Sequence, residues 1–181
     1  MRFDCRSLFR CPTAAILTAA ILIGAAGLTP AMAETPKNLG AYKKWKAMTA
    51  EADGNRTCYA MSEPASKLGN VKGRGQVAAL VTHFPEIGAL DQVSIVLGFA
   101  PQKKSPVIVK IGGFTFKFTE VKEDRAWVKT RADDKALVQA MRKSNQMVVT
   151  ATTEKGLKVQ DTYDLSGFTK AYQTMSKACT S

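Results

Sequence analysis

Short runs of alternating hydrophobic and polar residues, separated by turn-forming residues, dominate the chain after residue 44. The clearest run is 114–121, where Phe114, Phe116 and Phe118 alternate with threonine and lysine, the two-residue period of a half-buried strand. The two glycines before Phe114 predict a tight hairpin turn. Further strands are predicted at 45–49, 57–61, 76–82, 92–99, 106–111, 126–130, 146–153 and 157–165.

Two later segments repeat their hydrophobic residues with the period of a helix. The first runs from 133 to 144, with Asp133 or Asp134 expected as its N-cap and an apolar stripe through Leu137 and Met141. The second closes the chain and places five apolar side chains on one face: Phe168, Ala171, Tyr172, Met175 and Cys179. Many short strands with two short helices predict a mainly β protein, an antiparallel β-sandwich or curled barrel whose last helix is C-terminal.

The N-terminal segment has a different composition. Three arginines in the first ten residues are followed by an apolar run from 13 to 28 and by Ala31-Met32-Ala33, which together predict a cleavable secretory signal at 1–33. Residues 34–44 are expected to form a flexible lead-in, because proline, asparagine and glycine there disfavour regular structure. Residues 45–181 are then a single domain, in which no apolar run approaches the roughly 20 residues that a membrane-spanning helix needs.

The cysteines carry the most specific prediction. Cys5 and Cys11 lie in the predicted signal, so Cys58 and Cys179 remain for an oxidising compartment, where a disulfide between them is expected. This bond would close a loop of about 120 residues and stabilise the fold by roughly 4–5 kcal/mol in the chain-entropy model. Thiol–disulfide catalysts usually place two cysteines at C-x-x-C spacing, so the wide separation here disfavours a redox function.

Charge limits the range of partners. The chain has 26 Lys and Arg against 15 Asp and Glu, and the predicted signal accounts for only three Arg and one Asp of these. An exported domain this basic suits phosphorylated lipids, acidic polysaccharides or acidic partner proteins, and peripheral membrane association is compatible with the same charge. Nucleic acid would fit the charge, but the predicted export argues against it. The alternative is a solvated basic surface that only aids solubility.

Six basic residues are the candidate contacts for an anion or a partner. Two of them belong to a glycine-rich loop, whose backbone N–H groups beside positive charge are suited to cradling an anion. The other four surround Trp127. The candidates are Lys72, Arg74, Lys122, Arg125, Lys129 and Arg131. The structural alternative for the glycine loop is that it simply turns the chain into the next strand.

Catalytic and metal chemistry find little support in the sequence. His83 is the only histidine, and no nucleophile-elbow motif accompanies it, so a loop or edge histidine is expected rather than the base of a triad. A zinc site needs three or four convergent ligands, which one histidine and two cross-linked cysteines do not supply. No catalytic residue, metal ligand or cofactor is therefore predicted.

A set of spaced elements runs through most of the chain from 45 to 179. It comprises Trp45, Cys58-Tyr59-Ala60, Pro64, Arg74-Gly75, Pro85, Val93-Ser94, Gly98-Phe99, Ile111-Gly112-Gly113, Phe116, Ala126-Trp127, Met141, Met147-Val148-Val149, Gly156, the run from Asp161 to Phe168, Ala171 and Ala178-Cys179. The ordered set resembles the invasion-associated locus B family, exported proteins of alphaproteobacteria. The resemblance implies a protein of the periplasm or outer membrane, with a role in host-cell invasion in pathogenic members, and it attaches no catalytic residues to the pattern.

The hypothesis that follows is a non-enzymatic periplasmic or envelope-associated protein that binds an anionic envelope component or an acidic envelope protein. Two alternatives remain open at this point. One is a hydrolase that acts on envelope polymers, and the other is a secreted virulence factor that binds host proteins directly.

Overall fold

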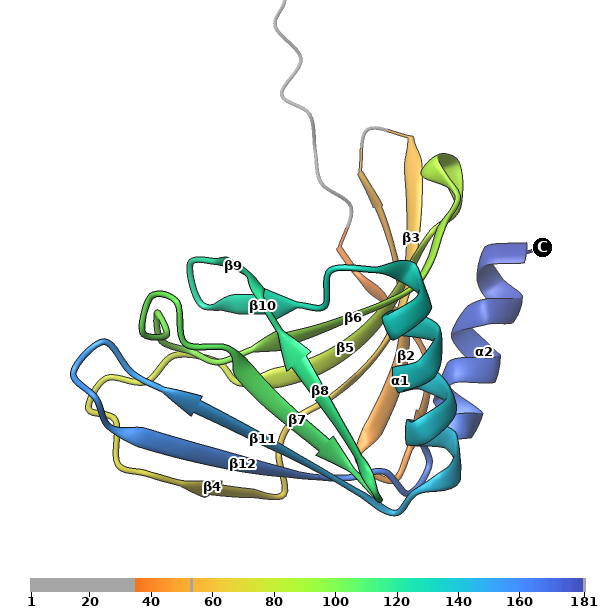
Figure 1. Ribbon diagram of the computed structural model, residues 1–181. Coiled ribbons are helices and arrows are strands. Elements are labelled where there is room, and N and C mark those ends of the chain that lie inside the picture. The colour runs from red at the N-terminus through yellow and green to blue at the C-terminus, as the bar shows by residue number, and fades with distance from the viewer. Residues whose placement is uncertain (1–34, 53, 181) are drawn as a thin grey trace, which may run out of the picture. The chain divides into compact units, whose positions relative to one another are not determined.

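A computed structural model describes residues 35–52 and 54–180, so the predicted signal at 1–33 lies outside the described residues. The strands form two antiparallel sheets (Figure 1). The seven-stranded sheet has, in spatial order, β1 (Lys37–Tyr42), β2 (Trp45–Ala52), β3 (Asn55–Ser62), β5 (Ala78–Phe84), β6 (Ala89–Val96), β10 (Arg125–Trp127) and β9 (Glu120–Lys122). The five-stranded sheet has β4 (Ser66–Leu68), β12 (Lys158–Asp164), β11 (Gln146–Thr152), β7 (Val107–Ile111) and β8 (Phe114–Phe118).

The two sheets bury their facing sides in one hydrophobic core. Alternate residues of each strand point inward, as in β7, where Val107, Val109 and Ile111 are buried and Lys110 is exposed. Both sheets keep free edge strands, which a closed barrel would not have. The predicted mainly β fold with antiparallel sheets is therefore confirmed, and it takes the open sandwich form.

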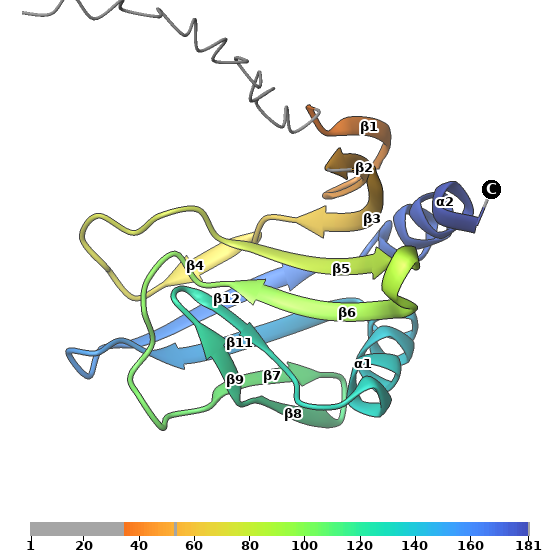
Figure 2. The same cartoon turned by 90° about the horizontal axis from the view of Figure 1, so that it is seen from above.

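The two helices lie side by side at one end of the sheets (Figures 1 and 2). Helix α1 (Arg131–Lys143) packs mainly on β6, whereas α2 (Phe168–Thr180) packs on β1, β2 and β3. Phe168, Ala171 and Met175 are buried on the predicted face of α2. Neither helix in the described part of the chain is long and apolar enough to cross a membrane.

The N-terminal cap of α1 corrects one sequence prediction. The cap is Thr130, whose hydroxyl oxygen accepts the backbone N–H of Asp133 at 3.1 Å and whose hydroxyl donates to the Asp133 carboxylate at 2.7 Å. Asp134 is instead buried and accepts the backbone N–H of Val93 on β6 at 2.9 Å. Thr130, Asp133 and Asp134 all lie near the start of the helix, and the hydrogen bond of Asp134 to β6 removes this residue from the choice of cap.

The expected absence of regular structure between residues 34 and 44 is wrong for β1. This strand pairs with β2 from Lys37 to Tyr42, and a shift in register between Asn38 and Gly40 accommodates the glycine. Pro36 precedes the first paired residue, so it removes no hydrogen bond from the ladder. Local composition disfavoured a strand here, but the neighbouring edge of β2 supplied the backbone partners.

The run predicted as one strand at 114–121 belongs to both sheets. β8 ends at Phe118 in the five-stranded sheet, and β9 begins at Glu120 in the other, so the chain changes sheets at Thr119. Burial along β8 is graded, because Phe118 is buried while Phe114, at the outer end, is 64% exposed. The alternation correctly predicted the strand, but it carried no sign of the change between sheets.

Candidate functional site

The predicted disulfide between Cys58 and Cys179 is present. Cys58 lies on β3 and is fully buried, while Cys179 lies in the last turn of α2, with 5.9 Å between the two Cα atoms. The bond joins residues 121 positions apart. It fixes the C-terminal end of α2 to the seven-stranded sheet, and it has the structural function that the wide cysteine spacing predicted.

Arg74 is not available to an external anion, which corrects the sequence hypothesis for the glycine loop. Its guanidinium donates two hydrogen bonds to the Asp161 carboxylate, at 2.9 and 2.5 Å, and its Nε donates to the backbone oxygen of Leu97 at 2.9 Å. The Asp161 side chain is 1% exposed and that of Arg74 10% exposed. Because Leu97 follows β6 and Asp161 lies on β12, Arg74 links the two sheets.

Close backbone packing surrounds this ion pair. The N–H of Gly75 donates to the backbone oxygen of Gly98 at 2.9 Å, and the guanidinium of Arg74 lies 5.2 Å from the centre of the Phe99 ring. A Cβ on Gly98 would meet the backbone oxygens of Gly75 and Gln76 at 2.7 and 2.8 Å, and the φ of Gly98 is +72°. The Arg-Gly and Gly-Phe elements noted in the sequence thus form one structural connection.

The other five basic candidates are not all brought together. Lys122 and Arg125 are register partners across the turn of the β9–β10 hairpin, so these two like charges face one another. Lys129 and Arg131 flank the cap of α1 and are exposed, and Lys72 is exposed in the loop after β4. The structure therefore provides one basic pair, Lys122 with Arg125, and three separate exposed cations.

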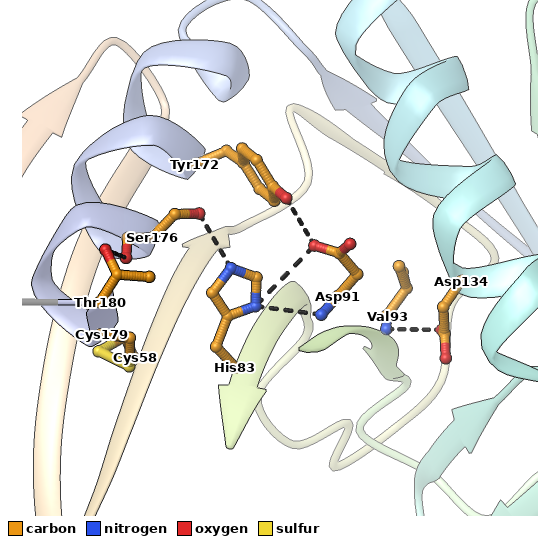
Figure 3. Close-up of polar contacts among 9 residues, drawn as sticks. All are labelled: Cys58, His83, Asp91, Val93, Asp134, Tyr172, Ser176, Cys179 and Thr180. Atoms are coloured by element: carbon orange, nitrogen blue, oxygen red, sulfur yellow. Dashed lines mark hydrogen bonds and ion pairs between the residues drawn. A yellow bond between two sulfur atoms is a disulfide. The ribbon is translucent and has the colours of Figure 1, made fainter. Parts of the chain in front are cut away.

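A polar cluster that sequence reasoning did not find surrounds His83 (Figure 3). His83 is 4% exposed on β5, and its Nε2 lies 2.9 Å from the Ser176 hydroxyl on α2. Its Nδ1 accepts the backbone N–H of Asp91 at 3.0 Å. The cluster forms where β5 and β6 slip register between Thr82 and Phe84, a bulge that leaves His83 without a partner on β6 while it stays paired with Cys58 on β3.

The hydrogen bonds of His83 define its tautomer. A backbone N–H is always a donor, so Nδ1 must be the unprotonated nitrogen and Nε2 must carry the hydrogen, which it donates to Ser176. A triad base needs the opposite arrangement, with Nδ1–H donating to a carboxylate and Nε2 free to accept the serine proton. The nearest Asp91 carboxylate oxygen is 3.9 Å from Nδ1. Ser176, His83 and Asp91 therefore have the composition of a triad but not its hydrogen bonds.

The electrostatics of this cluster favour a neutral histidine. Burial lowers the pKa of His83, and the nearby Asp91 carboxylate only partly opposes this effect. Asp91 accepts a hydrogen bond from the Tyr172 hydroxyl at 2.6 Å. Burial is the larger cause and this hydrogen bond the next, and together they raise the pKa of Tyr172 to about 12. Burial also raises the pKa of Asp134 to about 6, although the N–H of Val93 opposes the shift. Hydrogen bonds of Tyr172 and Ser176 connect α2 to the sheet, and the hydrogen bond of Asp134 connects α1 to it.

The two signs of charge are distributed differently in the described structure. Every lysine there is exposed, and so is every arginine except Arg74 and Arg125. Several acidic side chains are drawn inward instead, namely the buried Asp134 and Asp161 and the half-buried Asp91, Asp124 and Asp164. The fold therefore presents a surface that is more basic than the composition alone indicates. Between residues 35 and 180, residue 53 excepted, no three His, Cys, Asp or Glu side chains gather in a way that could hold a metal.

Two signals in the sequence could have located the polar groups that were missed. Asp161 lies between Val159 and Tyr163 at the inward positions of β12, which marks it as an acid on an apolar face in need of a partner. Ser176 lies four residues after Tyr172 on α2 and therefore shares its side of the helix. His83 has no comparable signal, because the bulge that orients it depends on the pairing of β5 with β6.

One known protein family matches most of the described sandwich. A family model described as Invasion associated locus B (IalB) protein matches residues 45–176. The match begins at the first residue of β2 and ends within α2, so it includes most strands of both sheets. No curated protein and no solved structure matches the chain.

Proposed function

The chain belongs to the invasion associated locus B family, and we propose that it is an exported, envelope-associated binding protein rather than an enzyme. In this proposal residues 1–33 direct export and are removed, and the remaining protein resides in the periplasm or at the outer membrane. Its ligand is an anionic component of the envelope or an acidic partner protein. In pathogenic relatives the same property contributes to contact with the host cell.

The outward bias of the basic side chains is the observation that carries this proposal. Lysines throughout the described structure are exposed, while Asp134 and Asp161 are buried. Such a surface attracts polyanions over distances set by salt screening, about 8 Å at physiological ionic strength. Among the six basic residues predicted from the sequence, Lys122 and Arg125 are the two that the structure pairs, because they face one another across the β9–β10 hairpin, whose turn is Glu123-Asp124.

A binding function agrees with the hydrogen bonds of the cluster around His83, whose residues have the composition of a catalytic triad. The tautomer of His83 prevents it from removing a proton from Ser176 while Nδ1 accepts the Asp91 N–H. The same hydrogen bonds hold α2 on the sheet, which is a sufficient structural reason for these residues to be buried there. The hydrolase hypothesis therefore gains no support from this cluster.

Co-sedimentation with lipid vesicles tests the proposal. We expect the protein to bind vesicles that contain phosphatidylglycerol and to dissociate from them as the NaCl concentration rises. It should not bind vesicles of phosphatidylcholine. The bound fraction should fall steeply between low salt and 0.5 M NaCl, because the screening length shrinks toward about 3 Å near 1 M salt. Equal binding to both vesicle types, or no binding to either at low salt, would contradict an anionic envelope ligand.

Export has its own test. N-terminal sequencing of the protein recovered from the periplasm should read Glu-Thr-Pro, the residues that follow Ala33. An intact chain that begins at Met1 and stays in the membrane fraction would contradict the predicted cleavage.

A further inference from the structure

A pocket of about 300 Å³ opens beside the β1–β2 turn, where three lysines meet. Tyr42 pairs with Trp45, so Lys43 and Lys44 are the two residues of the turn. Lys46 is the next outward residue of β2, because Trp45 and Ala47 on either side of it are buried. The opposite wall consists of Met61, Ser62, Glu63, Pro64 and Ala65.

The backbone fixes this arrangement of lysines. Lys46 is the register partner of Met61 on β3, and Trp45 is the partner of Ser62, so the turn and the segment after β3 are held against each other by strand pairing. Lys43 has a φ of +55°, a left-handed conformation that glycine or asparagine adopts more easily. Two consecutive lysines in this turn therefore line the pocket together with Lys46.

Two carboxylates differ in their availability to a ligand, Asp164 beside Lys43 and Lys44 and Glu63 in the lining of the pocket. Asp164 accepts the backbone N–H of Ser166 at 2.8 Å, and hydrogen bonds from Ser166 lower the pKa of Asp164, with smaller contributions from Lys43 and Lys44. Its charge is thus already stabilised by its own turn. Glu63 is exposed and lines the pocket itself, where it offers a hydrogen-bond acceptor beside a surplus of positive charge.

We propose that this pocket binds a phosphorylated sugar, an inference that rests on the proposed function and names its ligand class. Lysine ammonium groups are strong donors to phosphate oxygens. Glu63 would accept hydrogen bonds from the neutral hydroxyls of a sugar ring, a set of donors away from the phosphate charge that inorganic phosphate lacks. A volume of about 300 Å³ lies at the lower end of the range for small-molecule sites and accommodates one sugar ring with its phosphate.

Titration with glucose 1-phosphate tests the pocket, followed by amide chemical shifts of the protein. Saturable shifts should concentrate at residues 43–46 and 61–65, and glucose without phosphate should cause none. The double variant Lys44→Gln/Lys46→Gln should weaken binding at least about tenfold, because charge-assisted hydrogen bonds are lost. The matched variant Lys155→Gln/Lys158→Gln removes two exposed charges from the β11–β12 hairpin and should stay within about twofold.

The substitution Glu63→Ala tests the contact with the sugar separately from the contact with the phosphate. It should weaken binding of glucose 1-phosphate, whereas inorganic phosphate should bind as well as before or better, because a repelling carboxylate is gone. The sugar assignment is overturned if inorganic phosphate binds the unmodified protein as tightly as glucose 1-phosphate does. The pocket is overturned if glucose 1-phosphate does not saturate, or if the two double variants lose the same affinity.

Vesicles that carry a glycolipid with a phosphorylated sugar head group distinguish the sources of the ligand. Glucose 1-phosphate should displace the protein from these vesicles if the ligand belongs to a membrane, whereas binding of glucose 1-phosphate without association with these vesicles indicates a soluble ligand. Failure of the proposed function looks different from failure of the pocket. In the first case glucose 1-phosphate still saturates the pocket but no anionic vesicle binds, and in the second case phosphatidylglycerol vesicles still bind in a salt-dependent way but glucose 1-phosphate does not saturate.

Discussion

Arg74 and Asp161, 87 residues apart in sequence, form a two-point ion pair that joins one sheet of the sandwich to the other. Arg74 also holds the backbone oxygen of Leu97, at the end of β6, while Asp161 lies on the inner side of β12. Because both charges are shielded from water, each depends on the other for stabilisation. A basic residue that resembled a ligand contact in the sequence is therefore part of the scaffold.

The substitution Arg74→Met should destabilise the protein by about 3–5 kcal/mol, because it leaves the Asp161 carboxylate buried without its partner. Urea unfolding followed by circular dichroism measures the change. The double variant Arg74→Met/Asp161→Leu should be more stable than Arg74→Met alone, and Lys72→Met in the same loop should change stability by less than about 0.5 kcal/mol. Equal effects of Arg74→Met and Lys72→Met would contradict the structural function of the pair.

Removal of the disulfide should loosen α2. The double variant Cys58→Ala/Cys179→Ala should lose about 2–5 kcal/mol of unfolding free energy, the usual range for a native disulfide. Peptide mapping without reductant should recover Cys58 and Cys179 in one linked fragment. Separate alkylated fragments, each carrying a free thiol, would show that the bond does not form in the protein.

Two tyrosines offer a matched comparison, since each loses only a hydroxyl on substitution by phenylalanine. The Tyr163 hydroxyl is buried and has no hydrogen-bond partner among the described residues, so Tyr163→Phe should leave the protein equally stable or more stable by up to about 1 kcal/mol. The Tyr172 hydroxyl donates to Asp91, so Tyr172→Phe should cost about 1–2 kcal/mol. Thermal unfolding of both variants measures the difference, and a larger loss for Tyr163→Phe would contradict the assigned contacts.

His83 and Asp134 should change the acid response of the fold in opposite directions. Burial lowers the pKa of His83, so the unfolded chain binds its proton first, and stability from this group falls as pH drops below about 6.5. Burial raises the pKa of Asp134 to about 6, so between pH 6 and its unfolded value of 3.8 the folded protein binds the extra proton and gains stability as pH falls.

Unfolding free energies at pH 7.5 and pH 5 separate these two contributions. His83→Gln should lose less stability on acidification than the unmodified protein, and Asp134→Asn should lose more. An identical pH dependence in all three proteins would contradict the assigned protonation of both groups.

The sequence supported those features that depend on local pattern. Alternation predicted most strands, and the helical period of Phe168, Ala171 and Met175 predicted the buried face of α2. The presence of two cysteines after the predicted signal predicted the disulfide. The misses have a common physical cause. β1 forms because β2 offers it an edge, and the β8–β9 break reflects a change of sheet, so neither is encoded in the local run of residues.

The candidate site was harder to predict for the same reason. Whether Arg74 faces water or Asp161 depends on how the two sheets pack, and a list of basic residues contains no such information. Lys43, Lys44 and Lys46 were visible only as neighbouring charges until the pairing of β2 with β3 placed them around one pocket. The class of partner stays a prediction from sequence charge, while the arrangement of the contacts required the fold.

Association with outer-membrane vesicles as a function of salt, measured for matched charge variants, tests the central claim most directly. The unmodified protein should bind at low salt and dissociate as NaCl increases, and Lys122→Gln/Arg125→Gln should weaken binding more than Lys155→Gln/Lys158→Gln does, with both variants equally stable. Equal losses in the two variants would contradict a localised contact at the β9–β10 hairpin. Absence of any salt-dependent association would contradict the account of this protein as a binder of anionic envelope material.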